Sequence, residues 1–351
     1  MEQNPDKYAG DLALISRQRS ALMGIAALIV CCFHEFLPVA PAGTWINSVE
    51  DFIIRVSFYG VDVFMLLSGM SVAFSLLKTP DAGEFYAKRA KRILPFYILS
   101  GVAMIFLAGW SIKDFFLNIT GVSFFTTSVN SYLWFVIVLI IFYLLAPLYQ
   151  KLLSSAGNPL IVFVVSFVLW VVLSIIIRGH IRDDFYYGID RMPVFMLGML
   201  LGNLIYNGVK VRYPVAFWLG ILSLFLIGWM MSYLSNYYGY DYLIGVVLSF
   251  LPRVALGVSV PYICAKILDL VRWKWLDKLL GFFGSFCFEL YIVQRVFDAR
   301  LHYFLRDHGI WGITRNLLML VILSLIAFVS SRIVNYLVDK ICSLDISKQN
   351  K

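Results

Sequence analysis

Long apolar stretches joined by short polar connections dominate the pattern of the chain. A helix needs about 20 apolar residues to cross about 30 Å of hydrocarbon, and helices that are hydrophobic on all sides are typical of membrane spans. The alternating ten-residue segments of a membrane β-barrel are absent from the sequence. The pattern therefore predicts an all-α fold, a polytopic membrane helical bundle with about ten transmembrane helices. The predicted spans are 20–39, 53–77, 95–111, 132–149, 159–177, 191–207, 214–232, 242–269, 279–297 and 315–339.

Positive charge predicts the orientation of this bundle. With the N-terminus in the cytoplasm, the inner segments hold twice as many Lys and Arg residues as the outer segments. Because Lys and Arg gather on cytoplasmic loops, both termini are expected inside. The sequence thus divides into a cytoplasmic segment (1–19), one transmembrane domain (20–341) and a cytoplasmic tail (342–351). The multi-pass protein is expected in the plasma membrane.

Composition narrows the class further. The chain has 351 residues, 61% hydrophobic and 14% charged, whereas soluble domains have about 45–50% apolar and about 25% charged residues. A soluble enzyme and a disordered chain are both excluded on these grounds. The net charge of +8 is explained by inner loops facing anionic lipid, so membrane lipids are expected partners and nucleic acid is not. Five cysteines without a CxxC pair predict neither a disulfide framework nor a metal site.

Ionisable residues within spans are functional candidates by default, because burying them in lipid costs about 2.5–3.5 kcal/mol each. His34 lies about 7 Å below the outer end of its span, and Asp62 about 13 Å below the outer end of the next. A histidine suits a general base, and Asp62 is a candidate to hold its imidazole in one tautomer. The alternatives are a packed histidine and an Asp62 that pairs with an arginine or a backbone amide. Glu35 points elsewhere, toward the outer interface or a substrate.

Two further residues are expected near the midplane. Arg253 follows Pro252, which is expected to break its span, and Glu289 lies about ten residues into the ninth span. Their similar depth predicts one buried ion pair. Structural stabilisation and catalysis both remain open for that pair.

The densest charged signal lies between the second and third spans, in the predicted inner loop Lys78–Pro95. Lys88, Arg89, Lys91 and Arg92 fall within five residues. Because guanidinium groups bind phosphate through two hydrogen bonds, this segment is a candidate site for a cytosolic phosphate-bearing donor. A simple anchor on the cytoplasmic side of the membrane is the alternative.

Several segments together resemble the membrane-bound acyltransferase family 3, ten-span bacterial enzymes that O-acylate carbohydrates and some other acceptors. The resemblance covers about residues 15–340, and its segments occur in the family's order and spacing. They are MGIAALIVCCFHEF with its terminal histidine, GVDVFMLLSG (60–69), RAKRILPFY (89–97), YLWFVIVLIIFYLLAPL (132–148), RMPVFMLGMLLG (191–202) and GSFCFELYIVQ (284–294).

The chain departs from the family pattern at two positions. The arginine that normally lies eleven residues before the histidine is replaced by Met23, although Arg19 lies one helical turn earlier. The histidine of the family's Tyr-Leu-x-His segment is replaced by Gln294, which forms hydrogen bonds but cannot act as a base. His34 is therefore left as the intramembrane histidine.

The resemblance implies an acyl-CoA donor, most often acetyl-CoA, and a carbohydrate or glycolipid acceptor at the cell surface. It assigns the donor's phosphates to Arg89 and Arg92, with Lys88 and Lys91 assisting. It gives His34 the role of base and Asp62 that of its partner. Substrate contacts are expected from the polar residues of the outer half and the later spans, namely Glu35, Arg191, Arg253, Glu289 and Gln294. The sequence does not indicate the oligomeric state.

Other readings of the sequence remain open. Ser68 or Cys32 could accept the acyl group covalently before transfer. A transporter or flippase would require discontinuous helices or inverted repeats, and a non-enzymatic component of polysaccharide export is the second alternative.

Overall fold

The computed structural model describes residues 10–126, 133–177, 188–238 and 242–349, and every regular secondary-structure element within these ranges is a helix. Seven helices of the described part are long and apolar enough to span a membrane. The all-α polytopic bundle expected from the sequence is therefore confirmed. These seven helices cover Trp45–Lys78, Ala82–Ala108, Trp134–Ser155, Pro159–Ile177, Pro214–Leu234, Phe250–Val271 and Gly312–Ile341.

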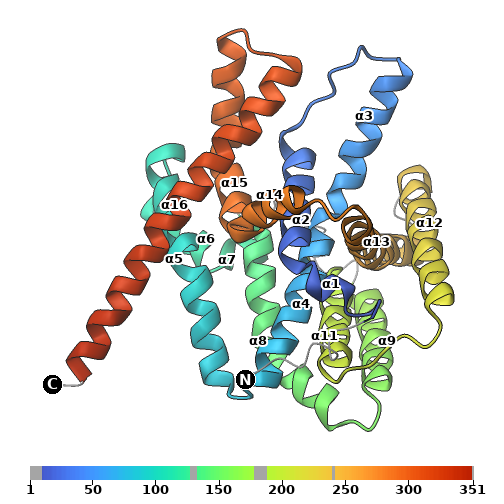
Figure 1. Ribbon diagram of the computed structural model, residues 1–351. Coiled ribbons are helices and arrows are strands. Elements are labelled where there is room, and N and C mark those ends of the chain that lie inside the picture. Colours follow the sequence, from blue (N-terminus) through green and yellow to red (C-terminus); the bar gives the residue numbers. More distant parts are fainter. Residues whose placement is uncertain (1–9, 127–132, 178–187, 239–241, 350–351) are drawn as a thin grey trace.

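The first half of the chain forms the helices from α1 to α8. Figure 1 shows α3 (Trp45–Val56) and the connection between α15 (Cys287–Asp307) and α16 (Gly312–Gln349) reaching out at the top of the molecule. The connection between α4 (Gly60–Lys78) and α5 (Ala82–Ala108) lies at the bottom. The elements of this half are α1 (Leu14–Arg17), α2 (Arg19–Glu35), α3 (Trp45–Val56), the 3-10 turn η2 (Ser57–Tyr59), α4 (Gly60–Lys78), α5 (Ala82–Ala108), α6 (Ile112–Ile119), α7 (Val122–Thr126) and α8 (Trp134–Ser155).

The second half contributes α9 (Pro159–Ile177), α11 (Met192–Tyr206), α12 (Pro214–Tyr238), α13 (Tyr242–Val271), α14 (Lys274–Ser285), α15 (Cys287–Asp307) and α16 (Gly312–Gln349). The helix α13 runs unbroken through Pro252, so the expected break at that proline is wrong. The helix α11 has 15 residues and is shorter than a full span.

Two glycines, Gly69 on α4 and Gly198 on α11, allow these two helices to pack in close contact at the centre of the bundle. A Cβ atom added to Gly69 would lie 2.2 Å from the Phe195 carbonyl oxygen, and one added to Gly198 would lie 2.2 Å from the Leu66 carbonyl oxygen. Only hydrogen at these positions lets the two backbones approach so closely, as small residues do in membrane helix pairs. Most of α4 is buried as a result.

Two predicted boundaries differ from the structure. The basic segment expected as a loop is helical, because Asp81 caps α5 by accepting a hydrogen bond from the Glu84 backbone amide (2.6 Å). The span expected over 279–297 is instead two helices that meet at Phe286. Here α14 crosses α2, and a Cβ atom at Gly284 would lie 2.1 Å from the Ser20 carbonyl oxygen.

Candidate functional site

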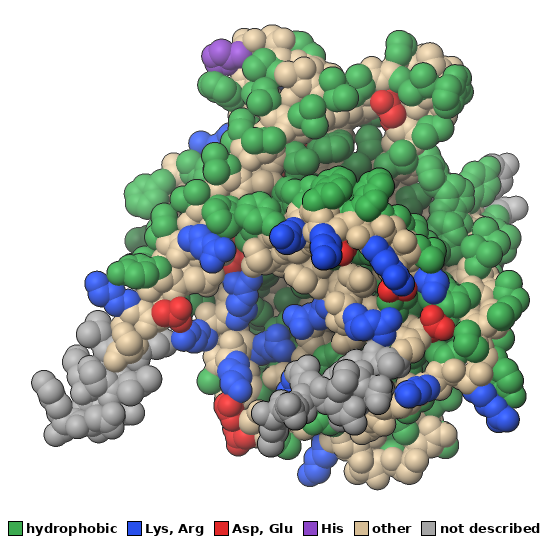
Figure 2. All heavy atoms as spheres, in the orientation of Figure 1, with side chains coloured by type: hydrophobic (Ala, Val, Ile, Leu, Met, Phe, Trp, Pro, Cys, Tyr) green, Lys and Arg blue, Asp and Glu red, His purple; other side chains and the backbone are tan. Residues whose placement is uncertain are grey.

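A cavity of about 600 Å³ lies between the helices that carry the family-like segments. This volume falls within the range of about 300–1,000 Å³ typical of ligand sites. Helices α1, α2, α4, α5, α8, α14 and α15 all contribute side chains to it. Figure 2 shows Lys and Arg side chains gathered across the middle of one face of the molecule. The lining includes Arg17, Arg19, Ser20, Met23, Phe64, Ser68, Ser71, Arg89, Arg92, Tyr143, Cys287 and Tyr291.

The helical form of the basic segment divides its four cations into two pairs. Arg89 and Arg92 are three residues apart on α5, so they share one helix face, and both line the cavity. Lys88 instead pairs with Glu84 at 2.5 Å, and Lys91 pairs with Asp339 on α16 at 3.1 Å. Neither lysine is among the residues that line the cavity, so the structure does not bring all four predicted phosphate ligands together.

Arg92 is held by a buried carboxylate. Its two terminal nitrogens donate to the two oxygens of Glu289, and the Nη2–Oε2 distance is 3.1 Å. The side chain of Glu289 is only 2% exposed, whereas that of Arg92 is 41% exposed. The predicted ion pair between Arg253 and Glu289 is therefore wrong. The prediction rested on their similar depth in the membrane, but Glu289 pairs with Arg92 and Arg253 pairs with Asp190.

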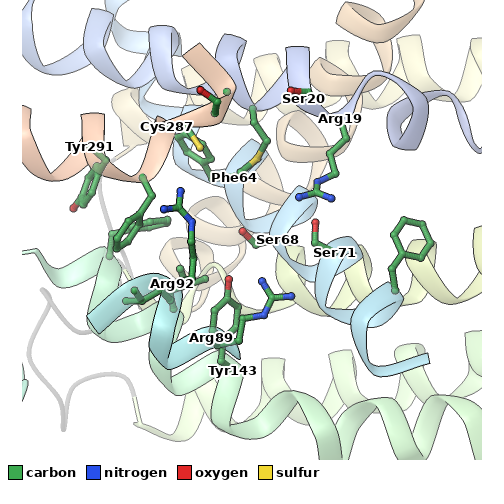
Figure 3. Close-up of a pocket in the computed structure, with 18 of the residues that line it drawn as sticks. Arg19, Ser20, Phe64, Ser68, Ser71, Arg89, Arg92, Tyr143, Cys287 and Tyr291 are labelled. Atoms are coloured by element: carbon green, nitrogen blue, oxygen red, sulfur yellow. The ribbon is translucent and has the colours of Figure 1, made fainter. Parts of the chain in front are cut away.

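Arg19 and Arg89 approach the cavity from different helices, and within the described part of the chain neither forms an ion pair with an acidic side chain. The Arg89 guanidinium lies 5.3 Å from the Phe85 ring centroid and 5.1 Å from that of Tyr143, in cation–π contact. The charges of Arg19 and Arg89 are close enough to oppose one another. Figure 3 shows the arginines converging on the Ser68 and Ser71 hydroxyls. Two adjacent uncompensated cations favour an anionic ligand between them.

Arg19 supplies the guanidinium that Met23 lacks at the family's usual arginine position. Both residues line the cavity, and Arg19 is the first residue of α2. A guanidinium is thus present at the cavity although the usual arginine position is occupied by methionine. Tyr143 was not singled out from the sequence, since an aromatic residue within an apolar span carries no distinguishing signal.

His34 lies in the last turn of α2 and is partly exposed, and its ring packs edge-on against Phe33 with centroids 4.9 Å apart. It is not among the residues that line the cavity. His34 therefore lies outside the cavity lining, near the C-terminal end of α2, whereas the lining residues of α2 lie near its start.

Asp62 does not orient His34. Its carboxylate pairs with Arg191, with 3.4 Å between Oδ1 and Nε, and both side chains are buried. The Cβ of Asp62 lies beneath Gly257 of α13, on the side of α4 that meets α11 and α13. The predicted partnership with the histidine is wrong, and the alternative of an arginine partner is confirmed.

The other outer charges form a compact, buried network. Arg253 donates to Asp190 at 2.9 Å. The guanidinium groups of Arg191 and Arg253 lie 5.1 and 5.5 Å from the Phe58 ring centroid. The buried side chains of Arg191 and Arg253 each contact an acidic residue and the ring of Phe58. These contacts join α4, α11 and α13. The structure thus favours a packing role over the predicted substrate contacts.

Glu35 is 2% exposed and marks the anchored end of α2. Arg315 of α16 donates to the Glu35 backbone carbonyl, which places a cation at the C-terminal end of the helix dipole. Its Nη2 atom also lies 2.8 Å from His302 Nδ1. Burial and, next, the Arg315 charge lower the pKa of the His302 imidazole. This anchor fixes the turn that carries His34.

Gln294 links α15 to the same part of α2. The Cys31 thiol donates to Gln294 Oε1 at 2.9 Å, and Gln294 is fully buried. Its Nε2 group has no hydrogen-bond partner in the described part of the chain. Cys287, Tyr291 and Gln294 lie at helical spacing on α15, and the first two line the cavity. One face of α15 therefore leads from the cavity to Gln294, which contacts Cys31, one helical turn before His34 on α2.

These features define a polytopic membrane protein with a cationic cavity among its helices. A family model described as an acyltransferase domain, acyltransferase family 3, matches residues 21–336. The chain therefore belongs to acyltransferase family 3, and the function at that level is a membrane acyltransferase. No curated protein and no solved structure matches the chain.

Proposed function

We propose that the protein transfers an acyl group, most often acetyl, from acyl-CoA to a hydroxyl of a carbohydrate or glycolipid at the outer surface of the plasma membrane. The observation that carries the proposal is the pair of uncompensated guanidinium groups, Arg19 and Arg89, in the cavity. Coenzyme A is polyanionic, and arginine is the side chain best suited to phosphate. Ser68 and Ser71 add hydroxyls beside these cations.

The donor would enter from the cytoplasm, where the positive-inside pattern places α1 and the start of α5. Its phosphates would lie against Arg19 and Arg89, while Arg92 stays bound to Glu289. The acyl-pantetheine arm would extend past Cys287 and Tyr291 along α15. This path leads toward the turn of α2 that holds His34.

In the proposed step His34 takes the proton from the acceptor hydroxyl, and the oxygen attacks the thioester carbon. The new carbon–oxygen bond forms as the carbon–sulfur bond breaks, and the coenzyme A thiolate leaves and takes up a proton. Negative charge develops on the carbonyl oxygen during attack. The free Gln294 Nε2 group is a candidate donor to that oxygen, a role that hydrogen-bond donors fill in acyl transfer.

A covalent route through Ser68 would use a hydroxyl that lines the cavity, whereas Cys32 is not among the lining residues. The structure provides no base beside Ser68 within the described residues that line the cavity, so direct transfer is the route proposed.

Equilibrium binding of coenzyme A to the purified protein in nanodiscs, followed by isothermal calorimetry, tests the donor site. Arg89→Ala is compared with Lys88→Ala, a neighbouring cation that lies outside the cavity. The proposal expects weaker binding in the first variant alone. Equal binding in both variants, or none in the wild type, would contradict it.

A further inference from the structure

A second, apolar groove opens on the lateral face of the bundle between α8, α9 and α11, away from the cationic cavity. Its volume is about 310 Å³, and fourteen side chains line it, of which only Ser166, Tyr149 and Trp170 carry a polar atom. Three of the lining residues are methionines. Flexible, polarisable methionine side chains adapt to irregular apolar ligands.

Aromatic packing explains why the groove is preformed. Trp170 of α9 is 5% exposed and packs against Phe250 of α13, with ring centroids 5.3 Å apart. Phe167 stacks on the same indole at 6.5 Å. These large rings hold α9 against α13, and the groove lies beside this contact, among α9, α8 and α11. If the groove stayed empty, the side chains that line it would lose dispersion contacts with any partner atoms.

The rim of the groove consists of lipid-facing residues. Leu148 on α8 and Leu169 on α9 are each 63% exposed, and both belong to helices long and apolar enough to span a membrane. The medium outside the groove is therefore hydrocarbon. On α8 the lining runs from Phe142 to Leu152, about 15 Å at helical rise, which is half of the hydrocarbon thickness of about 30 Å. That length corresponds to the chain of a lipid in one leaflet.

The hydroxyl of Tyr149 indicates which kind of lipid the groove would bind. Tyr149 lines the groove, and its buried hydroxyl has no hydrogen-bond partner in the described part of the chain. It lies six residues before the end of α8, about 9 Å from that end, where the polar boundary of a bilayer is expected. An ester carbonyl at the head of a phospholipid chain is an acceptor at this depth. A polyisoprenoid chain carries no such acceptor.

We propose that this groove binds one acyl chain of a phospholipid from the leaflet on the α8–α9 connection side, with the Tyr149 hydroxyl donating to its ester carbonyl. The bound lipid fills the space between α9 and the central helices α8 and α11. This site is separate from the acyl-CoA site and does not depend on it.

Native mass spectrometry of detergent-purified protein, together with nanodiscs containing a phospholipid with a diazirine midway along one chain, tests the proposal. Wild type is expected to retain one phospholipid and to cross-link within α8, α9 and α11. Leu169→Trp places a large side chain in the groove, and its matched control is Leu226→Trp on α12, an equally exposed position at 60%. Lipid retention should be lost in the first variant and kept in the second.

Tyr149→Phe is the conservative variant, which keeps the ring and removes the hydroxyl. Its lipid retention should fall roughly two- to tenfold, the worth of one hydrogen bond. Unchanged retention in Leu169→Trp, or cross-links spread evenly over α9 and α12, would overturn the proposal. So would a retained polyisoprenoid, or cross-links between two protein copies across the groove.

Discussion

Arg92 and Glu289 form a bidentate ion pair at the wall of the cationic cavity. The carboxylate is almost completely buried on α15, and the guanidinium reaches it from α5. One of the cavity's cations is therefore already neutralised by the protein itself. Arg19 and Arg89, which belong to α2 and α5, are two further cations of the lining that can contact an incoming anion.

Replacing either available arginine should weaken coenzyme A binding. A hydrogen bond to a charged group contributes about 1.5–3 kcal/mol, so Arg89→Ala or Arg19→Ala should raise the Kd roughly 10- to 150-fold. Calorimetry in nanodiscs measures this change. Lys91→Ala, which removes a cation bound to Asp339 outside the cavity, is the control and should bind normally. A larger loss in the lysine variant would contradict the assignment.

Removing the carboxylate of Glu289 should destabilise the protein. Glu289→Gln leaves Arg92 partly buried without its counter-charge, and the free energy of unfolding should fall by about 1–3 kcal/mol. Thermal unfolding monitored by fluorescence in detergent measures the change. The double variant Glu289→Gln with Arg92→Met should recover much of the loss, since no unpaired cation remains. Full stability in the single variant would show that the pair contributes nothing.

The pair of Asp62 and Arg191 should behave as a structural unit. Both side chains are buried, and breaking such a pair by removing one partner costs about 3–5 kcal/mol. Asp62→Asn is therefore expected to lower the unfolding temperature strongly. If Asp62 oriented His34 instead, this variant would keep its stability and lose acyl transfer. Measuring unfolding and turnover on the same preparation separates the two outcomes.

The close approach of α4 and α11 makes Gly198 intolerant of any side chain. Gly198→Ala would place a methyl group 2.2 Å from the Leu66 carbonyl oxygen, which forces the helices apart. Overpacking of this kind costs about 1–3 kcal/mol. The control is Gly220→Ala on α12, where a Cβ atom meets nothing within 4 Å. Equal unfolding temperatures for the two variants would show that the helices separate at little cost.

Sequence patterns predicted the class of fold well because they depend on local properties. Length and hydrophobicity located the long helices, and the RxxR spacing placed Arg89 and Arg92 on one face. The break at Phe286 was missed because the apolar stretch around it is continuous, and it depends on the crossing of α14 over α2 at Gly284. The start of α5 was missed because its first turns are charged rather than apolar, so they did not look like part of a span.

Charge partners were the least predictable part of the site. Asp62 pairs with a residue 129 positions later, and Glu289 pairs with Arg92 across 197 positions. Two charged residues can pair only if they lie at a similar depth in the membrane. Depth does not determine toward which neighbouring helix each residue faces. The pairing depends on helix rotation, which is set by contacts such as those at Gly69 and Gly198.

Transfer of radiolabelled acetyl from acetyl-CoA to candidate glycans by the purified protein tests the central claim most directly, with His34→Gln as the comparison. The account predicts that wild type moves the label. It also predicts that His34→Gln binds coenzyme A with an unchanged Kd but transfers at least about 100-fold more slowly, the contribution of a general base. Transfer at the wild-type rate by His34→Gln, or label trapped on Ser68, would contradict the account.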